Sequence, residues 1–557
     1  MRARPVNPTR VDADLAVGYA ELGALCAGAP VVAVDGMWGA DWDRIVAALP
    51  GYRVVRTTDY LRPPEELRAH FQPWLTGNPV FGRICDRPLS DYFRADALEA
   101  AARGDRLLVV GPGAAAVRPD ADLRLYCDVP REEIIRRQRQ EGLPNLGNLA
   151  SGGSGDRYKA AYYVEWPLLE AHKRTLLRGG AVDYYVDCTD RERPVALPLA
   201  VLEQVVADVA SRPFRCKPFF MPGVWGGQRL KEAAGLPPEW PNCAWDFEVV
   251  APENAVTVDV GGVAVTLPFH ILMWLQARRI VGEQVYRQFG EFFPVRINYL
   301  DTMQGGNLSL QVHPHHTYMR QQFGEPIGQD ESYYVVERAP GSKVYLGLTE
   351  SATRERLAEA VRRAQEEQVP FDIAEFANAW DAHVGDLFLI PAGTVHCSGA
   401  GNLVLEISST PYWYTFKIYD YLRPDLDGRP RPINAGFAFD VIDFTRTTGW
   451  VERYLLPRPL LLREEQGGRE YHLGSHAMTF YGVNRLHIDS EMGDDTAGGF
   501  LLLTVVSGEG AILWAADDQA LAEIRYLETY VVPASLGRFR LSAIGGPCQV
   551  VKTYVRR

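Results

Sequence analysis

The stretch "GNLSLQVHPHHTY", residues 306–318, decides which fold the sequence predicts. Apolar and polar residues alternate through LSLQV before the chain turns at Pro314, which is typical of a β-strand with one buried face. Because residues i and i+2 of a strand point the same way, Gln311 and His313 share a face and Val312 points to the other. The stretch therefore predicts a strand that presents an amide and an imidazole side by side.

Two further residues extend this pair to a candidate metal site. Glu331 opens the next predicted strand, "ESYYVVE", and His396 follows the turn in "GDLFLIPAGTVH". One amide oxygen, two imidazoles and one carboxylate suit a divalent metal, and such a mixed set with an open position suits catalysis better than a structural role. The expected ligands of one metal ion are Gln311, His313, Glu331 and His396.

The bulk composition limits the class of protein. The chain has 557 residues, 47% of them hydrophobic and 23% charged, so three or four domains are expected. Its 58 basic and 70 acidic residues give a net charge of −12, which disfavours nucleic acid and anionic membranes as partners. The eight cysteines form no C-x-x-C pair, so no cysteine zinc site or disulfide framework is expected. The first residues contain no apolar signal core and the apolar runs are short, so we expect a cytoplasmic protein.

Residues 1–212 alternate short β-branched runs with helical patterns, which predicts an α/β domain with a parallel sheet. A helix should begin near Asp41 or Trp42, after the first buried strand and its glycine turn. The order of elements resembles nucleoside-kinase-like P-loop proteins, but the turn "GMWGADW" lacks the lysine of G-x-x-x-x-G-K-[ST]. We expect a degenerate kinase-like domain that serves as a scaffold or regulator. Nucleotide binding through residues 36–39 is the alternative.

The rest of the chain is rich in short strands. Alternating segments separated by turn residues predict an antiparallel sandwich or barrel, interrupted near 351–380 by a pattern of helical spacing. The last part contains "VVPASLGRF", with Pro533 but no histidine at the offset of His396, so a metal-free companion barrel is expected there. The predicted domains are 1–212, 213–436 and 437–557.

The spacing G-x5-P-x-G-x2-H from Gly385 to His396 is the second cupin motif, in which turn residues deliver a histidine into a barrel mouth. Together with "VWGGQRLKE", "LSLQVHP", "GQDESYYVV" and "KIYDYLR", it makes the chain resemble the type I phosphomannose isomerases over about residues 215–557. The resemblance implies an all-β bicupin, which is a double-stranded β-helix or jelly-roll fold. It also implies that mannose 6-phosphate and fructose 6-phosphate are interconverted. The implied zinc ligands are Gln311, His313, Glu331 and His396.

Several polar positions depart from the family pattern. The family has a lysine two residues before the metal-binding glutamate, where this chain has Gln329, and an arginine before L-Y-D-Y, where it has Lys417. An aspartate that the family carries four residues before that arginine is replaced by Trp413. Lys417 keeps a positive charge without the bidentate fork of a guanidinium. The expected catalytic groups are Lys417, Glu406 as a base or an orienting group, and Arg423 as a phosphate ligand.

Two other functions stay open. One is a cupin isomerase or epimerase that acts on another sugar or sugar phosphate. The other is a non-catalytic sensor, in which the metal site binds a sugar phosphate and the N-terminal domain signals its presence. The substituted positions Gln329 and Lys417 favour these alternatives, whereas the complete ligand set argues against a purely structural relic.

Overall fold

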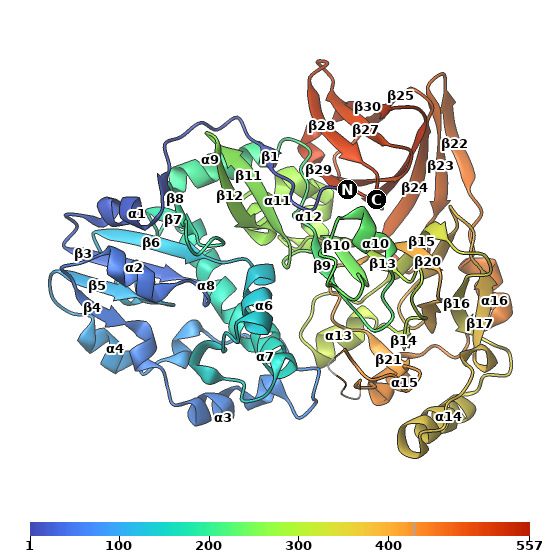
Figure 1. Ribbon diagram of the computed structural model, residues 1–557, viewed down its shortest axis with the longest axis horizontal. Helices are drawn as coiled ribbons and strands as arrows, with labels where there is room; N and C mark the ends of the chain where they lie inside the picture. The colour runs from blue at the N-terminus through green and yellow to red at the C-terminus, as the bar shows by residue number, and fades with distance from the viewer. Residues whose placement is uncertain (427, 429–430, 557) are drawn as a thin grey trace. The chain divides into compact units, whose positions relative to one another are not determined.

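The structure is a computed structural model that describes residues 1–426, 428 and 431–556. The chain divides into two compact units (Figure 1). Val6–Val209 and Ala255–Gln276 form the first, which we name the α/β unit. Met1–Pro5, Ala210–Asn254 and the residues from Ala277 onward form the second, the β unit. No helix among the described residues is long and apolar enough to cross a membrane.

A seven-stranded sheet lies at the centre of the α/β unit, in the order β2-β8-β7-β6-β3-β5-β4. The five strands from β4 to β7 run parallel, but β8 is antiparallel to β7 and β2 is antiparallel to β8. The sheet is therefore mixed, which corrects the prediction of a parallel one. Residues 188–194 between β7 and β8 are too few for a crossover, so β8 must return antiparallel. The strands are β2 (Ala16–Val17), β3 (Val31–Gly36), β4 (Arg53–Arg56), β5 (Leu107–Val110), β6 (Leu123–Asp128), β7 (Tyr184–Asp187) and β8 (Val195–Pro198).

Helices accompany these strands as the sequence predicts. Asp41 caps the helix after the first glycine turn, where its carboxylate accepts from the amide of Arg44 at 3.2 Å, so the predicted helix start is confirmed. The helices of this unit are α1 (Tyr19–Cys26), α2 (Trp42–Ala48), α3 (Pro64–Leu75), α4 (Ala95–Ala101), α5 (Ala114–Val117), α6 (Arg131–Gln140), α7 (Ser154–Ala160), α8 (Trp166–Arg178) and α9 (Leu199–Val209).

A hairpin from the middle of the chain also belongs to the α/β unit. Strands β11 (Ala255–Val260) and β12 (Val263–Pro268) pair with each other, and β11 pairs in parallel with β1 (Asn7–Pro8). The start of helix α11 (Phe269–Val281) follows them. The sequence pattern placed this hairpin in the β-rich domain, because alternation shows that a segment is a strand but not which strand it pairs with.

Four antiparallel sheets make up most of the β unit, and we name them as two pairs. The first sheet pair has the orders β18-β15-β20-β13-β10-β9 and β17-β16-β19-β14-β21. Its strands are β9 (Phe219–Met221), β10 (Trp245–Val249), β13 (Val295–Asp301), β14 (Leu310–Val312), β15 (Glu331–Arg338), β16 (Lys343–Leu348), β17 (Ala377–Asp381), β18 (Leu387–Ile390), β19 (His396–Ser398), β20 (Asn402–Ser409) and β21 (Phe416–Tyr419).

The second sheet pair comes from the C-terminal part of the chain, with the orders β22-β23-β24-β31-β26-β29 and β25-β30-β27-β28. Its strands are β22 (Leu460–Glu465), β23 (Gly468–Gly474), β24 (Tyr481–Ile488), β25 (Glu491–Asp495), β26 (Leu501–Ser507), β27 (Gly510–Ala515), β28 (Ala520–Arg525), β29 (Thr529–Val532), β30 (Arg538–Ile544) and β31 (Cys548–Val555). Both pairs belong to one compact unit.

The predicted helical interruption is present but shorter than expected. Helix α14 (Arg354–Glu367) forms with Leu357 and Val361 on its buried side, but β17 takes up the end of the predicted helical region and pairs with β16. The other helices of the unit are α10 (Arg229–Ala233), α12 (Glu283–Phe289), α13 (His316–Gln322), α15 (Ala435–Val441) and α16 (Thr448–Tyr454).

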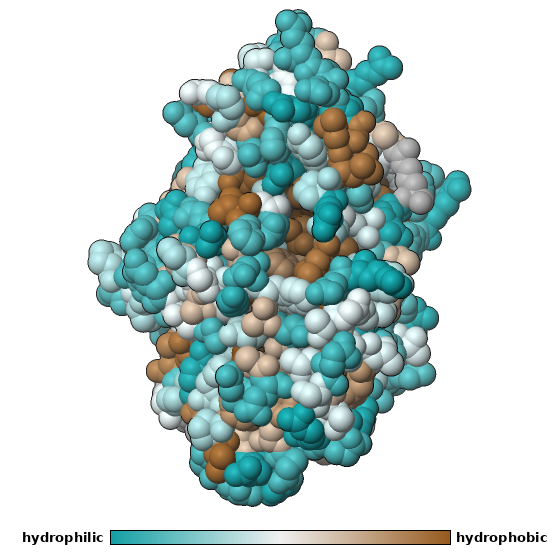
Figure 2. All heavy atoms as spheres, turned by 90° about the vertical axis from the view of Figure 1, so that its right-hand side faces the viewer, coloured by the Kyte–Doolittle hydropathy of each residue, from teal (hydrophilic) through white to brown (hydrophobic). Residues whose placement is uncertain are grey.

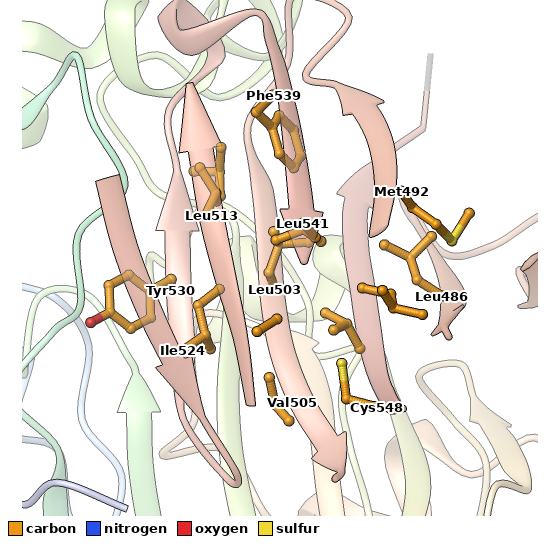
Figure 3. Close-up of a cluster of buried hydrophobic side chains, with 14 of the residues drawn as sticks. Leu486, Met492, Leu503, Val505, Leu513, Ile524, Tyr530, Phe539, Leu541 and Cys548 are labelled. Carbon is orange, nitrogen blue, oxygen red and sulfur yellow. The ribbon is translucent and has the colours of Figure 1, made fainter. Parts of the chain in front are cut away.

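A hydrophobic core fills the space between the two sheets of the second pair. Leu503 of β26, Leu513 of β27 and Leu541 of β30 are fully buried and point toward one another (Figure 3). Figure 2 looks at the side on which β22 and β17 lie in Figure 1, and that face is mostly hydrophilic with separate apolar patches. Leu460, at the start of edge strand β22, is 62% exposed.

Replacing Leu541 by alanine should destabilise the second sheet pair by about 2–5 kcal/mol, because buried methyl groups are lost and a cavity remains. Leu460→Ala is the matched control, with an expected effect within about 0.5 kcal/mol. Hydrogen–deuterium exchange of β26 and β31 in urea measures the difference. Equal protection in both variants would contradict this assignment of the core.

Candidate metal centre

Three acid–base side chains meet inside the first sheet pair. His313 directly follows β14, Glu331 opens β15 and His396 opens β19. Their exposed fractions are 2%, 1% and 0%. Because β15 lies in the six-stranded sheet and β14 and β19 lie in the five-stranded sheet, the cluster joins the two sheets.

The distances bring the imidazole nitrogens to one carboxylate oxygen. Glu331 Oε2 lies 3.1 Å from His313 Nε2 and 2.8 Å from His396 Nε2. On the far side of the rings, His313 Nδ1 lies 3.2 Å from the carbonyl oxygen of Tyr414. His396 Nδ1 lies 2.8 Å from the carbonyl oxygen of Thr394. A carbonyl oxygen at Nδ1 accepts a hydrogen bond from the ring N–H, so the proton stays on Nδ1 and the Nε2 lone pair is free to bind a metal.

Gln311 occupies the centre of a row across the five-stranded sheet. It stands directly opposite His396 on β19 and opposite Lys417 on β21. Directly opposed residues of antiparallel strands share a face, so the three side chains point to the same side. Gln311 Nε2 lies 3.3 Å from His396 Nε2. The structure therefore brings the predicted amide beside His396.

A register shift decides which residue of β21 joins this row. Leu310 pairs with Tyr419, whereas Gln311 pairs with Lys417, so Ile418 is the extra residue of a β-bulge. In an unbroken ladder Ile418 would stand opposite Gln311. The bulge thus makes Lys417, in place of the apolar Ile418, the residue of β21 that pairs with Gln311.

Glu406 lies on the facing sheet, in a network of polar side chains. It stands opposite Asn298 of β13, and its Oε2 accepts from Asn298 Nδ2 at 3.0 Å. Arg296 forms an ion pair with Glu406, and its Nη2 lies 3.9 Å from Glu331 Oε1. Two-residue spacing puts Arg296 and Asn298 on one face, and the alternation in "VRINY" carries that signal in the sequence. The network connects Glu406 to the candidate ligand Glu331.

Burial and neighbouring charges set the protonation of the cluster. Burial alone would raise the pKa of Glu331, but His313 and His396 hold that pKa well below its usual range. Burial lowers the pKa of the His313 imidazole. A carboxylate beside a neutral imidazole is the protonation state that binds a metal. Burial raises the pKa of Glu406 well above its usual range, against the opposing charge of Arg296.

The turn at residues 391–394 contacts the segments that carry all three side chains. The amide of Gly393 donates to the carbonyl of His313 at 2.9 Å. The amide of Ala392 donates to Asp330 Oδ1 at 2.9 Å, directly before the carboxylate ligand in the chain. The last residue of the turn supplies the carbonyl that orients the second histidine. One turn thus fixes the relative positions of the three candidate ligands.

Arg423 has its own partners in the structure. Its Nη1 donates to the carbonyl of Asn307 at 2.8 Å, and its Nη2 donates to Asp420 Oδ1 at 2.5 Å. These bonds tie the chain after β21 to the chain before β14. A role for Arg423 toward phosphate stays a prediction.

The two other substituted positions lie near His313. Gln329 is fully buried, and its amide lies 3.2 Å from His313 Nε2. Trp413 precedes Tyr414, whose carbonyl faces the same ring. An amide therefore stands beside the imidazole where the phosphomannose isomerase pattern has a lysine.

The donor set fits a divalent metal. Within the described part of the chain, His313, Glu331 and His396 form a group whose ligand atoms all lie within 4.8 Å of one another. Two Nε2 atoms, one carboxylate and a neighbouring amide match a site that keeps a position open, and carbonyls at both Nδ1 atoms are the usual support for such histidines. The arrangement does not select one metal among those that accept nitrogen and oxygen ligands.

Replacing His396 by alanine should abolish stoichiometric binding of a divalent metal, because the site loses a fully buried ligand. The wild-type chain should retain about one Zn2+ after dialysis, measured by inductively coupled plasma mass spectrometry. His315→Ala is the matched control, since His315 is exposed and caps helix α13. Retention of the metal by the His396 variant would exclude this centre.

The N-terminal part of the chain matches a protein family described as "Domain of unknown function (DUF8485)", over residues 18–211. The match covers most of the α/β unit, extends two residues past its end at Val209, and does not include the hairpin β11–β12. The description names no activity.

Curated relatives match a larger part of the chain. Mannose-6-phosphate isomerase ManA of Bacillus subtilis (strain 168) is 24% identical over 334 residues, which are 60% of this chain and 96% of the relative. Mannose-6-phosphate isomerase of Streptococcus mutans serotype c is 26% identical over 304 residues, which are 54% of this chain and 86% of the relative.

A solved structure gives the fold. The crystal structure of mannose 6-phosphate isomerase from Bacillus subtilis matches with a TM-score of 0.50 and 21% identity, over 62% of this chain and all of that one. The antiparallel β region therefore has the cupin fold of that isomerase, as the sequence resemblance implied. Over about 60% of its length, this chain is distantly homologous to mannose-6-phosphate isomerases.

Proposed function

We propose that this protein is a metal-dependent aldose–ketose isomerase that interconverts mannose 6-phosphate and fructose 6-phosphate. The observation that carries the proposal is the buried group of His313, Glu331 and His396, with Gln311 and Lys417 in one row beside it. The distant homology to mannose-6-phosphate isomerases supports the reaction class. Zn2+ is the proposed metal, held by these two histidines, the glutamate and Gln311.

Isomerisation of an aldose to a ketose moves a proton between C1 and C2 through an enediol. The bound metal would supply Lewis-acid polarisation of the sugar oxygens. We assign the proton transfer to Lys417, because burial and the charge of Arg431 lower its pKa to about 8. A lysine with that pKa is partly unprotonated near neutral pH and serves as a base. Glu406, held by Arg296 and Asn298, would orient the neighbouring carboxylate ligand.

The phosphate group needs a cationic partner at the rim of the site. Arg423 and Arg431 both form ion pairs with Asp420, and these three side chains and Asp425 act on the pKa of Lys417. We assign the phosphate to Arg423 because it is one of the two guanidinium groups that neighbour Lys417.

For the α/β unit we propose a degenerate kinase-like domain with a scaffolding or regulatory role. Backbone groups of its first turn are bound within the protein. The amide of Met37 donates to the carbonyl of Cys127 at 2.8 Å, and Arg137 Nη1 donates to the carbonyl of Gly39 at 2.6 Å. A Cβ at Gly36 would lie 2.1 Å from the backbone carbonyl oxygen of Cys127, so the turn packs too closely against β6 for any residue but glycine. Such a turn offers fewer free amides to a phosphate than a P-loop does.

An NMR time course tests the isomerase proposal. Zinc-loaded protein is incubated in D2O with mannose 6-phosphate, with free mannose as a second substrate and the His396→Ala and His315→Ala variants as controls. With the wild type and with His315→Ala, we expect fructose 6-phosphate to form with deuterium at C1 and, through the reverse reaction, mannose 6-phosphate to gain deuterium at C2. We expect no change with His396→Ala.

If the protein binds zinc stoichiometrically but does not convert mannose 6-phosphate, the proposed reaction is overturned and the proposed metal site is not. The substitutions Gln329 and Lys417 would then favour another sugar substrate or a non-catalytic sugar-phosphate sensor. A thermal-shift screen with sugars and sugar phosphates identifies the ligand. The same NMR time course with that ligand then separates the two, since a sensor binds its ligand without converting it.

Lys417→Met should reduce kcat by about 10²–10⁴-fold and leave zinc binding unchanged, because it removes the proton carrier but no metal ligand. In the wild type, kcat/KM should rise as the pH increases through about 8, where Lys417 of the free enzyme loses its proton. Lys343→Met is the matched control, since this lysine of β16 pairs with Asp381 at the protein surface. A wild-type rate in the Lys417 variant would exclude the proposed role.

A further inference from the structure

A buried arginine, Arg446, binds the turn at residues 391–394, which contacts the segments that carry the candidate metal ligands. The Arg446 side chain is 4% exposed. Its Nη1 lies 2.8 Å from the carbonyl oxygens of Pro391 and Ala392. The same nitrogen lies 2.5 Å from the hydroxyl oxygen of Thr394. One guanidinium nitrogen therefore contacts three acceptors within a single turn.

The segment that carries Arg446 packs against the turn at a second point. The amide of Asp443 donates to the carbonyl of Gly393 at 3.0 Å, and Asp443 Oδ2 accepts from Arg446 Nε at 3.1 Å. Gly393 has a φ of +90°, and a Cβ there would lie 3.0 Å from the carbonyl oxygen of Val441. Gly393, which has a left-handed backbone conformation, is therefore hydrogen-bonded to His313 on one side and to Asp443 on the other.

These contacts lead directly to the metal-binding atoms. The hydroxyl that Arg446 contacts belongs to Thr394, whose carbonyl orients His396 Nδ1. The amide of Gly393 binds the carbonyl of His313. Hydrogen bonds from a charged donor are about twice as strong as neutral ones, and buried carbonyl oxygens that lose their donor are costly. Loss of the guanidinium would therefore loosen both histidines together.

We propose that Arg446 is a positioning residue of the metal centre, acting through the turn at 391–394. The inference rests on the proposed metal-binding function. It adds a residue from the C-terminal segment 437–557, for which the sequence predicted a metal-free companion of the metal site. Among the described residues, the hydrogen bonds of Arg446 include none to a candidate ligand atom. Its effect on the metal centre therefore passes through Thr394 and Gly393.

Cobalt titration of the full chain tests this role. Co2+ alone is the probe, because its visible spectrum reports the geometry of the site and its titration gives the affinity. Arg446→Met should weaken Co2+ binding about 10–100-fold, the usual effect of removing an outer partner of a metal ligand, and should change the visible spectrum. Arg446→Lys should restore part of the affinity, since an ammonium group can still donate to the turn.

Arg485→Met is the matched control. Arg485 also donates to a backbone carbonyl, that of Gly385, and to the Tyr334 hydroxyl, both at 3.2 Å, but not to the 391–394 turn. The Arg485→Met variant should have the Co2+ affinity and the visible spectrum of the wild type. If the role of Arg446 is purely structural, Arg446→Met lowers the stability of the protein without a selective spectral change, and Arg446→Lys does not restore the Co2+ affinity.

The outcomes separate the inference from the proposed metal site. Wild-type affinity and spectrum in Arg446→Met would overturn the positioning role and leave the metal site standing. Absence of Co2+ binding in the wild type itself would overturn both. If Arg446→Met does not fold, Thr394→Val decides, because it removes one of the three acceptors. An affinity several-fold below wild type is then expected, and an unchanged affinity would overturn the inference.

Discussion

The need to keep one carboxylate ionised inside the protein constrains the whole first sheet pair. Glu331 is 1% exposed, and the cost of removing an unpaired charge from water is several kcal/mol. Imidazole nitrogens at 3.1 and 2.8 Å meet this carboxylate from the opposite sheet, and Arg296 lies 3.9 Å away within its own sheet. The turn at residues 391–394, which leads from β18 into β19, is hydrogen-bonded to His313 and Asp330 and so holds both sheets around Glu331.

Local periodicity predicted much of the candidate site. Two-residue alternation put Gln311 and His313 on one face, and a turn motif of fixed spacing pointed to His396. Both signals are local, since they depend on strand geometry and on glycine and proline in a turn. The structure brings these side chains together with Glu331, as expected.

The remaining parts of the site depend on contacts between distant segments. Arg446 lies about 50 positions beyond the turn that it binds, and no spacing rule connects a loop arginine with a remote carbonyl. The ion pair of Arg296 with Glu406 also joins β13 to β20, which are neighbours in the sheet although six strands lie between them in the chain. In the α/β unit, alternation correctly marked β11 and β12 as strands, but their partner β1 lies near residue 7. Pairing partners are chosen by packing, which the pattern of a single segment does not contain.

The bulge at Ile418 has a consequence for how such a site changes over evolutionary time. Side chains on a strand alternate, so the insertion or loss of one residue in β21 exchanges the group that faces Gln311. His313, Glu331 and His396 belong to other segments and are unaffected by that change. A single inserted or deleted codon in β21 therefore exchanges a cationic for an apolar partner of Gln311 while the candidate metal ligands stay the same.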